Sequence, residues 1–96
     1  MTTLVLVEGT VRPDGLERLE AFLTEQLPAT RGFDGCRSLD CYLNKDDRTL
    51  VIVQRWDARS DYENYLAWRK QTGVFSDFAD LFDDGVQIRY GERLGV

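Results

Sequence analysis

Two stretches of this sequence carry apolar residues at consecutive positions, where a half-exposed β-strand would alternate apolar with polar residues. They are Thr3–Val11, which reads TLVLVEGTV, and Thr49–Asp57, which reads TLVIVQRWD. Their β-branched content and short length favour strands over helices. Strands of this composition form a sheet that is apolar on both faces, so something must cover each face.

The segments between and around these two strands complete a mixed order of strands and helices. We expect a helix over 14–27, a strand over 36–44, a helix over 60–72, a short helix over 74–82 and a strand over 86–94. Asp14 with Glu17, and Ser60 with Glu63, predict capping boxes at two helix starts, and Pro28 predicts that the first helix stops or kinks there. The order β-α-β-β-α-(α)-β predicts one α+β domain over residues 1–96, ferredoxin-like, with a four-stranded antiparallel sheet.

Helices in this arrangement cover only one face of the sheet. We expect one face to carry Leu4, Leu6, Leu50 and Ile52, and the other to carry Val5, Val7, Val51, Val53, Leu39 and Cys41. An uncovered apolar face of several hundred square ångströms is rare on soluble monomers. The sequence therefore predicts a homodimer, in which a second copy covers the Val5, Val7, Val51 and Val53 face.

Composition excludes several classes of function. The formal net charge is −5 and Lys and Arg are not clustered, so we expect no nucleic-acid partner. No apolar run approaches the roughly 20 residues that cross a bilayer, and the first residues lack the features of a signal peptide, so we expect no membrane partner and a cytoplasmic location. With no His and two Cys, a Cys/His zinc site, a His-ligated haem and His-dependent nucleophilic catalysis are excluded, and we expect no metal and no cofactor. Cys36 and Cys41 are expected on opposite faces of one strand, too far apart for a disulfide.

Arg69 is the first candidate for a functional side chain. On a helical wheel of the second helix it lies near the centre of the apolar arc, with Trp68 beside it. An unpaired buried charge is very unfavourable, so an inward-facing Arg needs a partner. Either its stem packs on the core while its tip reaches water, Glu8 or an Asp, or it is the cation of a pocket.

Trp56 is the second candidate, with Tyr62 and Tyr65 above it on the helix. Such an aromatic stripe forms either core packing or the wall of a ligand pocket. Polar residues in strands otherwise suited to burial favour the pocket, since buried polar groups pair or line a wet site. They are Gln54, Glu8 and Asp40, and we expect all three on the Trp56 face.

Several short motifs together resemble the antibiotic biosynthesis monooxygenase family over nearly the whole chain. They are Arg12-Pro13-Asp14-Gly15, Gly35-Cys36, and Gln54-Arg55-Trp56-Asp57 followed by the helix from Tyr62 to Phe75. The resemblance implies a ferredoxin-like subunit in a dimeric α+β barrel, with a pocket between sheet and helices. It also implies oxidation of quinols or polyketide anthrones by O2 without flavin, haem or metal, the deprotonated substrate being itself the reductant.

The resemblance carries over residue by residue only in part. Trp56 matches the tryptophan of the anthrone-oxidising relatives, and Tyr62 matches their tyrosine six positions further on. The active-site asparagine of these relatives aligns with Ile52, and their later arginine aligns near Asp77 or Phe78, so neither residue type is present at the matching position. We infer that Arg69 replaces the arginine from a neighbouring turn. The histidine of the haem-degrading branch falls near Ala79, so haem degradation is not expected.

The sequence thus predicts a cofactor-independent monooxygenase that acts on a small quinol, phenolic or polyketide-type aromatic substrate. The expected catalytic residues are Trp56, Tyr62, Arg69 and Glu8, with Arg69 stabilising a phenolate or enolate and Glu8 or Tyr62 relaying a proton. The expected substrate-binding residues are Tyr65, Trp68, Phe75, Phe78, Gln54 and Ile52. Two alternatives stay open: a non-catalytic dimer that binds small aromatics or serves a stress response, and a cofactor-free isomerase or cyclase.

Overall fold

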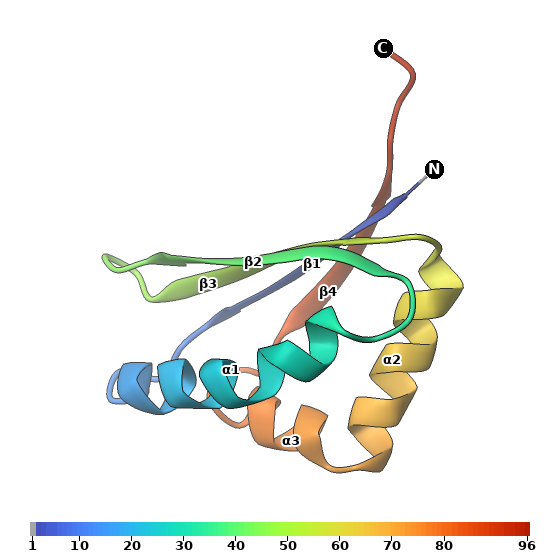
Figure 1. Cartoon of the computed structure of the whole chain (residues 1–96). Helices are drawn as coiled ribbons and strands as arrows, with labels where there is room; N and C mark the ends of the chain where they lie inside the picture. Colours follow the sequence, from blue (N-terminus) through green and yellow to red (C-terminus); the bar gives the residue numbers. More distant parts are fainter. Residues whose placement is uncertain (1) are drawn as a thin grey trace.

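A computed structural model describes residues 2–96 as two layers, a sheet and a set of helices on one of its faces (Figure 1). The elements are β1 (Thr3–Thr10), α1 (Leu16–Arg31), β2 (Cys36–Asn44), β3 (Thr49–Trp56), α2 (Arg59–Gln71), α3 (Val74–Ala79) and β4 (Gln87–Glu92). The four strands lie in the order β2-β3-β1-β4, and every neighbouring pair is antiparallel. The predicted ferredoxin-like α+β order is confirmed.

The pairing of β1 with β3 decides which side chains face the helices. Val5 lies opposite Gln54, and Val7 lies opposite Ile52. Directly opposed residues of an antiparallel pair point to the same side of the sheet. The expected division of the faces is therefore wrong: Val5 and Val7 share the helix-covered face with Ile52, and the open face carries Leu4, Leu6, Val51 and Val53.

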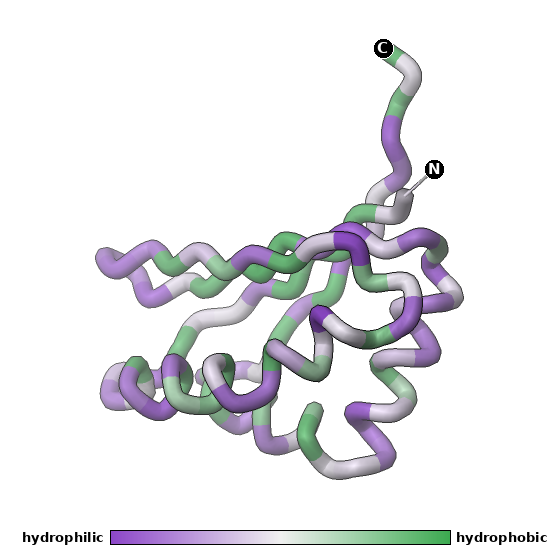
Figure 2. The backbone as a smooth tube through the Cα atoms, in the orientation of Figure 1, coloured by the Kyte–Doolittle hydropathy of each residue, from purple (hydrophilic) through white to green (hydrophobic). Residues whose placement is uncertain are grey.

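The helix-covered face forms the hydrophobic core. Val5, Ile52 and Trp56 are at most 4% exposed there. They pack against Leu19 from α1 and Tyr62 from α2. Figure 2 shows hydrophobic segments along the strands, in contrast to the hydrophilic tip of the β2–β3 hairpin. No helix of residues 2–96 covers the opposite face, where the four apolar side chains are half-buried.

Helix α1 runs further than the sequence predicts. It continues through Pro28 to Arg31, and the Gly32 N–H bonds back to the Pro28 carbonyl. The predicted capping boxes are also wrong, because α1 begins after Gly15 and α2 after Ala58, and neither residue supplies a side-chain cap. A helix that passes a proline without a cap depends on contacts from elsewhere in the fold.

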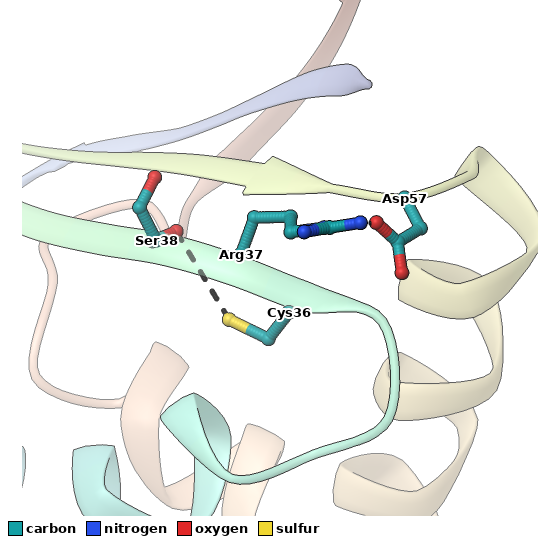
Figure 3. A network of polar contacts seen from close by, with 4 residues as sticks. All are labelled: Cys36, Arg37, Ser38 and Asp57. Carbon is teal, nitrogen blue, oxygen red and sulfur yellow. Dashed lines mark hydrogen bonds and ion pairs between the residues drawn. The ribbon is translucent and has the colours of Figure 1, made fainter. Parts of the chain in front are cut away.

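Strand β2 contains a bulge after its first residue, Cys36, and the bulge changes the face of the sheet to which Cys36 points. Cys36 pairs with Trp56 and Ser38 pairs with Arg55, so Arg37 is the extra residue. Figure 3 shows the Arg37 side chain reaching its ion-pair partner Asp57, while the Cys36 thiol donates a long contact of 4.0 Å to the Ser38 carbonyl. Cys36 and Cys41 therefore both face the helices, and the prediction of opposite faces is wrong. Burial raises the pKa of both free thiols, which makes them poor nucleophiles.

The sheet and the segment before β4 approach each other closely at Gly9. A Cβ on Gly9 would lie 2.7 Å from Cδ2 of Phe82 and 2.9 Å from the Gly85 carbonyl oxygen. Phe82 is 1% exposed and fills the space beside the strand. The absence of a side chain at residue 9 is therefore a packing requirement.

Replacing Gly9 with Ala is expected to destabilise the fold, because the Phe82 ring or the backbone at Gly85 must move. Overpacking of this kind costs about 1–3 kcal/mol. We expect a loss of that size in the free energy of unfolding, measured by urea denaturation at one fixed protein concentration. Gly95→Ala is the matched control, since a Cβ there meets no atom within 4 Å. Equal stabilities of the two variants would contradict the packing argument.

Candidate functional site

A cavity of about 60 Å³ lies between the helix-covered face of the sheet and all three helices. Its apolar lining comes from every layer, with Val7 and Ile52 from the sheet, Phe22 from α1, Leu66 from α2 and Phe75 from α3. Six polar side chains also line it: Gln26, Thr30, Gln54, Tyr62, Tyr65 and Arg69. Predominantly apolar walls with a few convergent polar groups are typical of a small-molecule site.

Arg69 holds two helices together at one end of this cavity. Its Nε donates to the Tyr65 hydroxyl at 2.9 Å, and its Nη1 donates to Oε1 of Gln26 at 2.9 Å. Its Nη2 donates to the Gln26 carbonyl at 2.8 Å and to the Thr30 hydroxyl at 3.0 Å. The side chain is 5% exposed, so the prediction that it faces inward is confirmed. The expected partner, Glu8 or an Asp, is wrong: all four acceptors are neutral.

These contacts join α2 to the last turns of α1, on both sides of Pro28. The Tyr65 and Thr30 hydroxyl oxygens lie 2.7 Å apart, so one donates to the other. A hydrogen bond to a charged group contributes about 1.5–3 kcal/mol, more than a neutral one. The Arg69 guanidinium thus supplies the tertiary contacts that the proline-containing end of α1 requires.

Trp56 acts on the cavity through Gln54. The two residues are neighbours on one face of β3, and the indole Nε1–H donates to Oε1 of Gln54 at 2.9 Å. An indole can only donate, so this bond fixes which end of the amide is oxygen. The NH2 end of the amide is therefore the end that Trp56 does not engage. Trp56 is 0% exposed and lies behind the cavity wall, packed against Tyr62, so its predicted place in that wall is wrong.

Tyr62 contributes a neutral phenol to the cavity. Burial, with smaller contributions from Tyr90 and Tyr65, raises the pKa of Tyr62 above its ordinary value of 10.0. The hydroxyl therefore keeps its proton throughout the neutral range. It can donate a hydrogen bond, but it is a poor general base.

The structure brings together most of the predicted site residues. Those that line the cavity are Tyr62, Tyr65, Arg69, Phe75, Phe78, Gln54 and Ile52. Trp68 lies outside it, 36% exposed, with its ring 4.6 Å from Cζ of Arg69. Glu8 lies opposite Val51 on the open face and pairs with Arg89 at 3.3 Å, so its expected place beside Trp56 is wrong. Asp40, opposite Val53, is on that open face too.

None of the α1 residues that line the cavity was predicted as a site residue, and two of them are polar, namely Gln26 and Thr30. They occupy the same face of the helix as Leu23 and Leu27, which also line the cavity. Polar residues four positions apart on an apolar helix face were the available signal.

In the part of the chain from residue 2 to 96, no group of three or more Cys, Asp or Glu side chains is arranged to hold a metal ion. Within the same range, no helix has the length and apolar composition needed to span a membrane.

Comparison with known proteins places the chain in a family. The sequence profile described as antibiotic biosynthesis monooxygenase matches residues 2–81. A Mycobacterium tuberculosis protein named "Putative monooxygenase Rv0793" is 37% identical over 75 residues, which are 72% of this chain and 74% of that protein. The chain belongs to the antibiotic biosynthesis monooxygenase family. The matched range of this family member includes every residue that lines the cavity.

Solved structures share the fold over almost their whole length. The structure of Rv0793 superposes with a TM-score of 0.74 at 28% identity, covering 100% of this chain and 98% of that one. A conserved protein from Methanosarcina mazei Go1 gives a TM-score of 0.87 at 13% identity, covering 98% of this chain and 94% of that one. At such low identity the second likeness shows the antibiotic biosynthesis monooxygenase fold alone.

Ionisation of Tyr62 is expected to reduce the stability of this family member at alkaline pH. In the unfolded protein Tyr62 ionises at its ordinary pKa of 10.0, whereas in the folded protein its pKa is raised. The stability that Tyr62 contributes is therefore complete below pH 10.0 and is lost as the pH rises from there through the folded pKa. The free energy of unfolding should therefore fall above that pH, with a contribution from Tyr62 of at most about 1.4 kcal/mol per pH unit. Urea unfolding on both sides of the unfolded pKa measures this slope.

The slope is tested with two single substitutions. Tyr62→Phe should remove the contribution of Tyr62 to the fall in the free energy of unfolding above pH 10.0. Tyr42→Phe, at a side chain that is 60% exposed, should leave that slope unchanged. A Tyr62→Phe variant with the same alkaline slope as the wild type would show that Tyr62 ionises normally in the folded protein.

Proposed function

We propose that this chain is a cofactor-independent monooxygenase that oxidises a small quinol, phenolic or polyketide-type aromatic substrate with O2. The observation that carries the proposal is the cavity itself, whose aromatic walls enclose hydrogen-bond donors in a member of a monooxygenase family. The name of the Mycobacterium tuberculosis relative supports the same reaction class.

In the proposed reaction the substrate supplies the electrons. Loss of a proton from a phenol or an activated CH2 group gives an anion that passes one electron to O2, and the resulting radical and superoxide then form a C–O bond. The peroxide takes up the proton that was lost first, the O–O bond and the remaining C–H bond of that carbon then break together, one oxygen stays on carbon as a carbonyl, and the other leaves as water. The protein's contribution is to bind the ring, exclude water and orient the anion.

The cavity residues divide this work between them. Tyr65, Phe75 and Phe78 would pack against the substrate ring, with Ile52 in the floor beneath it. Tyr62 would donate a hydrogen bond, while Arg69, with the Trp68 ring against it, would stabilise negative charge. Glu8 has no place in this proposal, because it lies on the opposite face of the sheet.

Substrate entry requires movement of the helices or their side chains. The cavity of about 60 Å³ is smaller than the ~150 Å³ cavity that holds a benzene molecule. Phe22 from α1 and Phe78 from α3 stack across it with ring centroids 5.8 Å apart. Because α3 is a helix of six residues, we expect it to be the element that shifts when a ring enters.

Oxygen consumption tests the proposed function. With a panel of dihydroxynaphthalenes and anthrones, in buffer with a chelator, the wild type should consume O2 and insert one atom of 18O2 into the product. Arg69→Met should reduce the rate about a hundredfold or more, since charge stabilisation by a buried donor is worth about 2.7–4 kcal/mol. Arg18→Met, on the exposed side of α1, is the matched control. A product without labelled oxygen would support an isomerase or cyclase, and no product at all would support a binding module.

We also propose that the open face of the sheet binds a second copy of the chain. Leu4, Leu6, Val51 and Val53 lie there, uncovered by any helix of residues 2–96, and the neighbouring Tyr42 on β2 is 60% exposed. Glu8 and Asp40 border these apolar side chains on the same face, and an exposed apolar patch with polar residues around it is typical of a protein interface. Pairing of two identical faces closes a symmetric dimer.

A charge placed in this face should separate the subunits. Val53→Asp would bury a carboxylate in the interface, so we expect the variant to sediment as a monomer at a concentration where the wild type is a dimer. Ala67→Asp, on the exposed side of α2, should leave the sedimentation coefficient of the dimer unchanged. A wild type that sediments as a monomer would refute the pairing.

A further inference from the structure

One row of side chains crosses the open face of the sheet from edge to edge. Asp40 on β2 lies opposite Val53 on β3. Val53 lies opposite Leu6 on β1, and Leu6 lies opposite Arg89 on β4. Directly opposed residues point to the same side of a sheet, so all four share the open face. The row therefore has an acid at one edge, a base at the other edge and two apolar residues between them.

The two charged ends of this row cannot pair within one chain. Asp40 and Arg89 lie on the two edge strands (Figure 1), so three strand spacings of about 4.8 Å each separate them. Asp40 forms no ion pair within residues 2–96. Arg31 lines the same surface hollow but donates to the Leu39 carbonyl at 3.1 Å. Arg89 pairs with Glu8 at 3.3 Å, yet it is 64% exposed and a guanidinium has donors for a second carboxylate.

The charges of the open face balance, although the chain as a whole carries a net charge of −5. Glu8 and Asp40 are its acids, and Arg55 and Arg89 are its bases. A symmetric contact brings the same face from both copies together, so a surplus of one sign would repel a second copy. This balance permits self-association, and the positions of the charges then decide the orientation.

Two-fold symmetry allows two limiting ways to lay this face on the same face of a second copy. If the axis runs along the strands, the strand order is reversed, and β2 lies on β4 of the second copy. If the axis runs across the strands, each strand lies on its own counterpart. In that case Asp40 meets only β2, whose one basic residue near this face, Arg37, is already paired with Asp57. Only the reversed order brings the row's acid onto its base.

We propose that two copies associate with reversed strand order, so that Asp40 of each copy forms an ion pair with the partner's Arg89. The inference rests on the proposed pairing of the open face, and it adds the direction of that pairing and the residues that select it. The same reversal lays Val53 on the partner's Leu6, so the apolar centre is self-complementary. Ion pairs at the margin of an apolar patch match the polar rim of protein interfaces, and complementary charges of this kind fix the register.

Reversing the charge at each end of the row tests the proposal. Asp40→Arg and Arg89→Asp each turn two attractive pairs into two repulsive ones. We expect the Kd of each variant's dimer, measured by sedimentation equilibrium at low salt, to rise about tenfold or more. A variant with both substitutions regains the pairs with their signs exchanged, and its Kd should lie within about threefold of the wild-type value. Glu25→Arg and Arg18→Asp, exposed on α1, make the same charge changes and should leave the Kd unchanged.

Mixing the two single variants shows that the ion pairs run between subunits. Fluorescently labelled Asp40→Arg should bind Arg89→Asp about as tightly as the wild type binds itself, since the mixed dimer has two opposite-charge pairs. Single variants that dimerise like the wild type would overturn the proposal, as would weakened single variants that neither mixing nor the double substitution rescues. If one single variant does not fold, the other one and the double variant complete the comparison.

The direction of pairing and the pairing itself fail separately. A wild type that stays monomeric would refute the association of the open faces. A wild-type dimer whose Kd is insensitive to charge reversal at Asp40 and Arg89 would keep the association and refute its direction. Neither result bears on the oxidation of a substrate, which the oxygen measurements test.

Discussion

The register of β1 against β3 is the constraint on which the rest of the structure depends. By pairing Val7 with Ile52 and Val5 with Gln54, it places Gln54 on the face that the helices cover. Because side chains alternate along a strand, a slip of one residue would exchange the two faces. The cavity floor, the Trp56–Gln54 pair and the open apolar face are all consequences of this one alignment.

The elements could be predicted from the sequence because their signals are local. Leu19, Leu23 and Leu27 recur at helical spacing, and the polar turn over 45–48 separates two β-branched runs, so each element was found within a few residues of its bounds. The register could not be predicted in the same way. A strand that is apolar on one face reveals its alignment through its pattern, but strands apolar on both faces do not. For this reason Val5 and Val7 were assigned to the wrong side.

In the candidate site, too, only the features that depend on local geometry could be predicted from the sequence. The inward direction of Tyr62, Tyr65 and Arg69 follows from helix geometry, which the sequence determines over a few turns. The hydrogen-bond partners of Arg69 could not be predicted in this way, because Gln26 lies 43 residues away in the sequence and reaches α2 only when the whole domain has folded. The bulge at Arg37 has no signature in residue type either, so nothing in the sequence indicated that Cys36 and Cys41 share a face.

The cavity has a stiff side and a compliant side. Its floor is a sheet in which β3 is paired with a neighbouring strand on each side, whereas its roof is three helices that meet through side chains such as those of Phe22 and Phe78. Gln54 and the indole that orients it both belong to β3, so a shift of the helices would leave them in place. Substitutions in α1 and α3 can therefore reshape the roof of the cavity while Gln54 keeps its place in the floor.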